Sequence, residues 1–126
     1  MPFSSTYFST NGTTNFPAVI TQMEALEILT LSQNKLTKLP EHFGNLQNLK
    51  TLNLTQNKLT SLPESFGALK SIKELRLSDN AFVEFPSSMG NMKTLEHLDL
   101  SRFETCCLPV FIGAFSELKI LNFGRF

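Results

Sequence analysis

The stretch LKTLNLTQNKLTSLPESFGAL (residues 49–69) combines closely spaced leucines with two asparagines, one Leu-Pro step and one glycine. Leu52 and Leu54 flank the polar Asn53, which is the period-2 pattern of a β-strand with one buried face. The proline ends the extended segment, and the apolar residue, glycine and leucine after it can pack a short turn against the same core. This stretch therefore predicts one strand and one return turn, a unit that cannot bury its apolar face alone.

The same pattern recurs every 23 residues, without a gap, over residues 26–126. A fixed period of about 20–50 residues indicates stacked supersecondary units. One column of equivalent positions holds Leu29, Leu52, Leu75, Leu98 and Leu121. We therefore predict a single domain over residues 1–126, made of a degenerate repeat at 3–25, full repeats at 26–48, 49–71, 72–94 and 95–117, and a partial repeat at 118–126.

Two segments, LEILTLSQNKL (residues 26–36) and LKTLNLTQNKL (residues 49–59), match the pattern L-x-x-L-x-L-x-x-N-x-L at each fixed position. The segments LPEHFGNL and LPESFGAL that follow are similar to a 23-residue subtype found in plant intracellular, Ras-associated and many bacterial repeat proteins. The chain thus resembles the leucine-rich-repeat superfamily over nearly its whole length. The resemblance implies an α/β fold, a right-handed parallel β-solenoid of about five to six repeats, with strands on the concave face and short helical or 3₁₀ turns on the convex face.

Asparagine occupies the ninth position of three repeats, as Asn34, Asn57 and Asn80. Its side-chain amide can bond backbone groups where the chain turns and cannot form a strand ladder. The fourth and fifth repeats break this rule, because Phe103 and Phe126 take the asparagine position. We expect the loop after residue 102 to depart from its siblings.

Composition and charge exclude several classes of protein. Formal net charge is zero, which argues against binding to nucleic acid, since that binding relies on attraction to phosphates. No apolar run approaches the length of a membrane-spanning helix. The opening MPFSSTYFST has no basic segment and no apolar run, so it is a poor secretory signal. We expect a cytoplasmic location, or a host cytosol if the protein is a bacterial effector.

The two cysteines, Cys106 and Cys107, are adjacent, so a disulfide between them would be strained. Free thiols in a reducing cytosol are expected. A zinc site needs four ligands, and these cysteines with two distant histidines supply no suitable spacing. We predict no metal and no cofactor.

One group of residues has the chemistry of an acid–base site, namely His97 beside Glu74, Asp79 and Asp99. In the repeat frame, His97 and Glu74 share a column on adjacent strands, about 4.8 Å apart. Catalytic groups need a concave, shielded site, and an open sheet offers none. We therefore expect a binding module without enzymatic activity, and an enzyme centred on His97 is the lesser alternative.

Function in such a solenoid is expected on the variable strand positions that face outward. The N-terminal half of this face is small and neutral, whereas the C-terminal half is rich in charge. Interface hot spots favour Tyr, Trp and Arg. The candidate partner-binding residues on the strands are Tyr7, Glu74, Arg76, Asp79, His97, Asp99, Arg102 and Arg125.

The C-terminal flank adds Phe103, Phe111 and Phe126 as candidate partner-binding residues. Phe111 stands where other repeats carry His42, Ser65 and Ser88. Either these phenylalanines form an apolar patch that something covers, or they turn inward and close a frayed end. Because an apolar patch at an open end is a common mark of an interaction site, the covered surface is the preferred interpretation.

An open sheet of this size suits a protein surface or an extended segment better than a small metabolite. The preferred function is a protein-binding module that blocks or positions a partner, as an inhibitor or adaptor. Small repeat proteins of this kind are among those that intracellular bacterial pathogens inject. The alternative is a substrate-recognition segment of a larger protein whose activity lies outside this chain.

Overall fold

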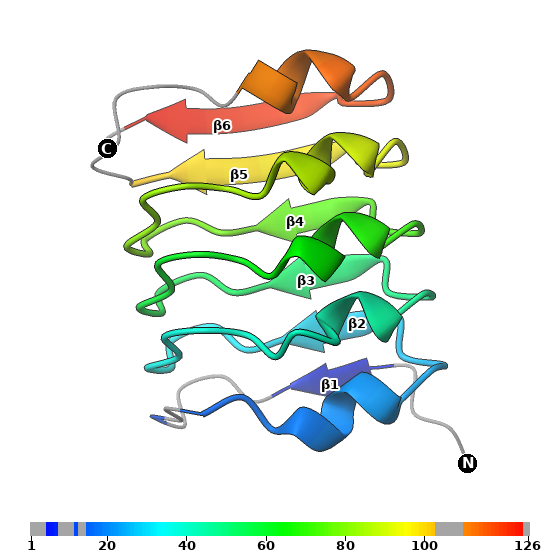
Figure 1. Cartoon of the computed structure of the whole chain (residues 1–126). Coiled ribbons are helices and arrows are strands. Elements are labelled where there is room, and N and C mark those ends of the chain that lie inside the picture. Colours follow the sequence, from blue (N-terminus) through cyan, green and yellow to red (C-terminus); the bar gives the residue numbers. More distant parts are fainter. Residues whose placement is uncertain (1–4, 8–11, 13–14, 103–109, 125–126) are drawn as a thin grey trace.

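The computed structural model describes residues 5–7, 12, 15–102 and 110–124. Its strands form one parallel sheet in which each strand pairs with the next along the chain, as Figure 1 shows. Equivalent positions of neighbouring repeats lie opposite one another, for example Leu52 and Leu75. The predicted parallel solenoid is confirmed. The strands are β1 (Ser5–Tyr7), β2 (Ile28–Thr30), β3 (Thr51–Asn53), β4 (Glu74–Arg76), β5 (His97–Ser101) and β6 (Ile120–Gly124).

The return segments contain short 3₁₀ helices, which stack in a second layer over the sheet (Figure 1). Pro17, Pro63 and Pro86 immediately precede three of them. A proline suits this position because its fixed φ is compatible with a helix start and its missing N–H is not needed there. The helices are η1 (Ala18–Gln22), η2 (Phe43–Asn45), η3 (Glu64–Ala68), η4 (Ser87–Asn91) and η5 (Val110–Ala114).

The core is one continuous column between the sheet and the 3₁₀ turns. Leu29, Leu52, Leu75 and Leu98 are 0% exposed. On the turn side, the rings of Phe43 and Phe66 stack with centroids 5.6 Å apart. Each repeat buries its apolar face against its neighbours, which explains why the repeats must be stacked to be stable.

The asparagine column forms the predicted backbone contacts. Asn57 and Asn80 each donate from Nδ2 to a carbonyl oxygen of the preceding repeat and to one of their own repeat. Their Oδ1 atoms accept from the backbone N–H groups of Leu36 and Leu59, respectively. Buried backbone groups at the turns are therefore satisfied by side chains where a strand ladder cannot continue.

The residue before the asparagine position has a positive φ in four repeats. Gln33, Gln56, Asp79 and Arg102 have φ angles of 58°, 60°, 55° and 60°. Non-glycine residues rarely adopt this left-handed conformation. Arg102 has it although Phe103 follows in place of asparagine, so the fourth repeat begins its turn like the others. The expected departure of the later loop lies outside the described residues.

Candidate protein-binding face

The outward side of the sheet, the strand face, is built by the period-2 alternation of the strands. Between the buried leucines, two columns of side chains point outward and are partly exposed. Each column runs in register from strand to strand. In the described strands β2–β6, the first column contains Ile28, Thr51, Glu74, His97 and Ile120, and the second contains Thr30, Asn53, Arg76, Asp99 and Asn122.

The ionisable side chains of these two columns come from β4 and β5. The register places Glu74 opposite His97 and Arg76 opposite Asp99. Arg76 Nε donates to Glu74 Oε2 at 2.6 Å, and both side chains keep a third or more of their surface exposed. A pair this exposed adds at most about 1 kcal/mol to stability, so its main effect is to orient the two side chains.

Asp99 is held by its own strand. Its Oδ1 atom accepts from the backbone N–H of Ser101 at 3.0 Å and from the Ser101 hydroxyl at 2.8 Å. Asn53 makes the equivalent contact with the N–H of Thr55. The position of the Asp99 carboxylate is thus fixed by a local turn, and its Oδ2 atom has no hydrogen bond or ion pair with the described residues.

His97 lies between Glu74 on β4 and Ile120 on β6. Its Nε2 atom is buried and has no hydrogen-bond partner in the part of the chain that the structure describes. The recorded ion pair of Glu74 is with Arg76. The structure therefore brings the acid and the imidazole together on one face but does not show a hydrogen-bonded acid–base pair. The described residues also contain no cluster of metal-ligating side chains.

Other predicted site residues have different positions. Asp79 and Arg102 follow β4 and β5 at the left-handed positions and are at least partly exposed. Tyr7 is the last residue of β1 and pairs with Thr30, but its side chain lies outside the described part. Phe103, Arg125 and Phe126 lie outside the described residues altogether.

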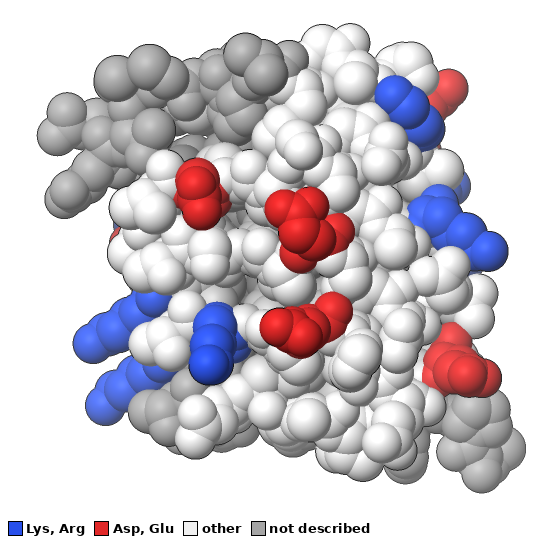
Figure 2. Space-filling view, viewed as in Figure 1, with Lys and Arg blue, Asp and Glu red and all other residues white. Residues whose placement is uncertain are grey.

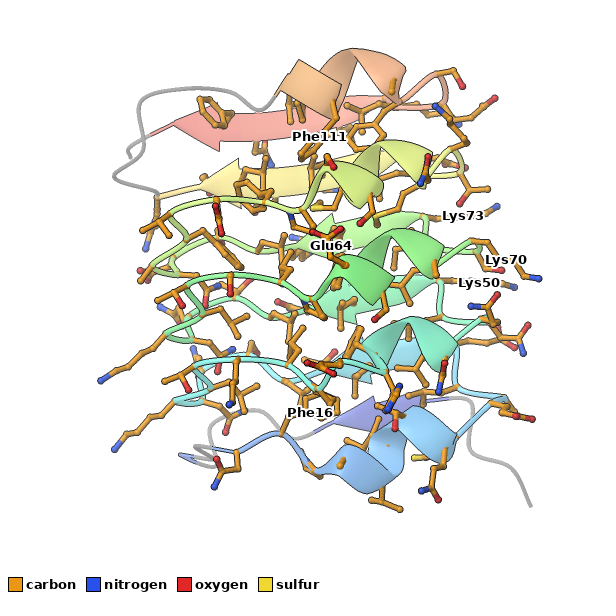
Figure 3. All side chains as sticks on the ribbon, in the orientation of Figure 1. Phe16, Lys50, Glu64, Lys70, Lys73 and Phe111 are labelled. Atoms are coloured by element: carbon orange, nitrogen blue, oxygen red, sulfur yellow. The ribbon has the colours of Figure 1, made fainter. Side chains whose placement is uncertain are left out.

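Phe111 is half-buried on η5 and packs against the core (Figure 3). Its ring centroid lies 6.5 Å from that of Phe85 and 5.9 Å from that of Phe115, with both pairs edge-to-face. The equivalent serines act differently, since Ser65 and Ser88 donate their hydroxyls to backbone oxygens of the preceding repeat. Inward packing thus accounts for part of the Phe111 surface, and the exposed part keeps its proposed role in binding.

One further column of the strand face was missed in the sequence reading. Thr55, Ser78 and Ser101 occupy equivalent positions, and the hydroxyls of Thr55 and Ser78 are 3.5 Å apart. The sequence pattern that could have indicated this column is a small hydroxyl residue that recurs in each repeat, directly before the residue with positive φ. Thr55 and Ser101 are partly exposed beside the charged columns, whereas Ser78 is buried at 7% exposed.

Comparison with known proteins places this geometry in a family. Residues 9–124 match the family described as a leucine-rich repeat region. The chain belongs to the leucine-rich-repeat family. None of the curated proteins compared matches the sequence.

Several solved leucine-rich-repeat structures resemble the chain. The leucine-rich-repeat protein LIC12759 of Leptospira interrogans is 34% identical with a TM-score of 0.84, covering 89% of this chain and 29% of that one. The repeat domain of the type III effector XopL is 25% identical with a TM-score of 0.88, covering 98% of this chain and 45% of its own. The ectodomain of the Arabidopsis thaliana receptor kinase GASSHO1/SCHENGEN3, solved with CASPARIAN STRIP INTEGRITY FACTOR 2, is 31% identical with a TM-score of 0.78. The match covers 93% of this chain and 15% of the ectodomain chain.

The leucine-rich-repeat chain therefore spans less than a third of the Leptospira protein that it resembles. Leucine-rich-repeat domains are protein-binding modules, and the fold is typically a non-enzymatic scaffold. Within the described residues, none of the helices has the length and apolar character needed to cross a bilayer.

Proposed function

We propose that this leucine-rich-repeat domain binds a partner protein through its strand face, with contacts centred on β4 and β5. The observation that carries the proposal is the cluster of Glu74, Arg76, His97 and Asp99, which stand in register and partly exposed on two adjacent strands. The described N-terminal part of the same face carries neutral side chains such as Thr30 and Asn53. A local concentration of charge on a neutral sheet provides orientation and specificity for a partner.

The proposed surface extends to Tyr7, Asp79, Arg102 and Arg125 along the strand face, and to Phe103, Phe111 and Phe126 on the C-terminal flank. Such a surface acts by occupying a partner, as an inhibitor or adaptor. Similarity to a receptor ectodomain solved with a second protein factor supports recognition of a protein or peptide. Similarity to the repeat domain of a type III effector supports an effector that works in a cytosol.

Affinity capture from the source cell tests the strand face. The bait variant Arg76→Ala/His97→Ala removes two side chains of the cluster, and Lys70→Ala/Lys93→Ala on the edge of the sheet is the matched control. We expect proteins retained by the wild type and the control to be lost with the strand-face variant. A hot-spot loss of about 2 kcal/mol corresponds to roughly thirtyfold in affinity. Equal recovery by both variants would show that the strand face is not the binding surface.

A second candidate function is recognition on behalf of a larger protein. The support for this candidate is that the chain spans only 29% of the Leptospira leucine-rich-repeat protein and 45% of the XopL repeat-domain chain. The native mass of the product in its source cell tests this candidate. An enzyme centred on His97 is tested separately, because His97→Ala should then abolish an activity while partner binding persists.

A further inference from the structure

Both edges of the sheet carry lysines, and some of these lysines are paired with glutamates. At the edge where the strands begin, Lys50 pairs with Glu27 at 3.4 Å. Lys73 and Lys119 both pair with Glu96, at 3.8 Å and 3.5 Å. Figure 3 shows Lys50 and Lys73 on this edge. Acidic residues in the same column thus compensate these three lysines, whereas Lys70 on the same edge (Figure 3) and the equivalent Lys93 have no ion pair within the described residues.

The opposite edge, where the strands end, carries an uncompensated lysine patch made of Lys35, Lys38 and Lys58. All three side chains are exposed, and none has an ion pair within the described residues. Lys35 and Lys58 are equivalent residues of consecutive repeats, whose turns are joined by the Lys58 N–H bonding to the Leu36 carbonyl at 2.8 Å. Figure 2 shows basic side chains gathered on this edge, at the level of β2 and β3.

Like charges in adjacent repeats repel each other, because their backbones are only about one strand spacing, ~4.8 Å, apart. An anionic group bound between them relieves this repulsion. The lysine patch is therefore a surface that gains from an acidic ligand. Lys70 and Lys93 at the other edge also have no ion pair within the described residues, so the charge of the patch counts toward the proposal only together with the groove beside Lys38.

An open groove starts at Lys38 and runs between two neighbouring repeats. It is lined by residues 38–41 and 61–63. Leu39 and Leu62 are buried beneath it, at 6% and 7% exposed. Pro40 and Pro63 offer no N–H, and their carbonyls already accept from the N–H groups of Phe43 and Phe66. The two proline rings lie above the buried leucines, so the part of the groove between Pro40 and Pro63 suits an apolar side chain.

We propose that the lysine patch and this groove form a second docking surface, which takes an extended acidic segment of a partner protein. Carboxylates of the segment pair with Lys35, Lys38 and Lys58, and an apolar side chain follows into the groove between Pro40 and Pro63. Glu41 lines the far end of the groove and repels acidic residues there. The acidic part of the segment is therefore confined to the lysine end, which fixes the direction of binding.

A nucleic acid fits this surface less well than an acidic protein segment. Formal net charge of the chain is zero. Glu41 on the groove, together with Glu64 on the neighbouring turn (labelled in Figure 3), would face a continuous phosphate chain unfavourably. A protein segment can instead place its charges at one end and its apolar residue at the other.

Fluorescence anisotropy with the full chain tests this docking surface. The probe is a labelled synthetic peptide with a run of glutamates followed by two leucines, compared with a version in which serines replace the leucines and with an oligothymidylate of similar charge. We expect saturable binding of the leucine peptide, weaker binding of the serine peptide and weaker binding of the oligonucleotide. Equal or tighter binding of either comparison probe would overturn the proposal.

Two variants of equal net charge locate the binding. Lys35→Gln/Lys38→Gln/Lys58→Gln should weaken the leucine peptide by about tenfold, since each exposed ion pair contributes modestly. Lys70→Gln/Lys73→Gln/Lys93→Gln, at the opposite edge, should leave its affinity within about twofold because exposed charges farther away than the Debye length are screened by salt. Equal losses of peptide affinity in both variants would show that binding depends on the net charge of the protein and not on the lysine patch. The strand-face variant Arg76→Ala/His97→Ala should bind this peptide normally, which separates this surface from the function proposed above.

Discussion

Asn57 joins two consecutive repeats by donating from Nδ2 to the Leu31 carbonyl oxygen at 2.9 Å and to the Leu54 carbonyl oxygen at 3.0 Å. Its Oδ1 atom accepts from the Leu36 N–H at 3.1 Å. The Asn57 residue is only 7% exposed. A single buried amide thus satisfies backbone groups on both sides of a repeat boundary, so a polar ladder holds the stack together alongside the leucine core.

Replacing Asn57 with alanine should lower the free energy of unfolding by about 1–3 kcal/mol. The change leaves the buried Leu36 N–H without its acceptor, which carries a cost of about that size, whereas the Leu31 and Leu54 carbonyls keep the Nδ2 donors of Asn34 and Asn80. Urea unfolding followed by circular dichroism gives the measurement. Asn45→Ala on the exposed surface of η2 is the control and should change stability by no more than about 0.5 kcal/mol. Equal effects of the two changes would argue against the ladder as a source of stability.

Replacing Leu75 with alanine should cost about 2–5 kcal/mol, because the side chain is 0% exposed and has a strand on each side. Leu121→Ala tests the same column at the last strand, where the leucine is 37% exposed. Since less surface leaves water there, the loss should be about half as large or less. Thermal melting of the two variants compares them directly, and a larger loss at Leu121 would mean that the sheet end is better covered than the structure shows.

Replacing Gly67 with alanine should destabilise the protein by about 1–3 kcal/mol through overpacking. A Cβ atom at this position would clash with the carbonyl oxygen of Ser88 in the next repeat, and backbone cannot move aside easily. Gly113→Ala on η5 is a matched control, because an added Cβ there meets no described atom within 4 Å. Both substitutions replace glycine with a residue of higher helix propensity, so this contribution is the same in the two variants. The difference between their melting temperatures therefore measures the clash between neighbouring turns. Identical melts would show that the repeats can separate at no cost.

The repeat frame could be predicted from the sequence because every repeat must satisfy the same packing and hydrogen-bonding needs. Each repeat needs buried leucines at alternating strand positions and an amide at the turn, and these needs leave a visible column at Leu52, Leu75 and Asn57. Strand register followed directly from the period, so the sequence also placed Glu74 opposite His97.

Other features of the structure, such as side-chain pairing and backbone conformation, are not determined by the residue type at a single position. The register offered Glu74 two partners, and the side chain pairs with Arg76 on its own strand rather than with His97 across the sheet. The positive φ of Gln33 and Gln56 belongs to residue types without a strong preference for that conformation. The hydroxyl contacts of Ser65 and Ser88 require the exact distance between turns, which a repeat pattern does not specify.

Phe111 distinguishes the last described turn from the earlier ones. At Gly67 the backbone of the next turn is so close that a Cβ atom would clash with it, whereas at Gly90 the nearest atom to such a Cβ is Phe111 Cβ at 3.3 Å. η5 therefore approaches η4 less closely at this position than the earlier turns approach one another. Part of the ring fills the space against Phe85 and Phe115, and the rest remains exposed.

Replacing Phe111 with serine should lower both stability and partner affinity. The lost ring contacts should cost about 2 kcal/mol, less than for a fully buried phenylalanine, because the ring is only partly buried and a serine can donate to the preceding turn as Ser88 does. Phe111→Leu keeps most of the apolar packing and should recover most of the melting temperature, but it removes the aromatic edge offered to a partner. Affinity for the captured partner, measured well below the melting temperature, should therefore fall in both variants. A lower melt for the serine variant with unchanged affinity in both would assign Phe111 to the core alone and remove it from the binding surface.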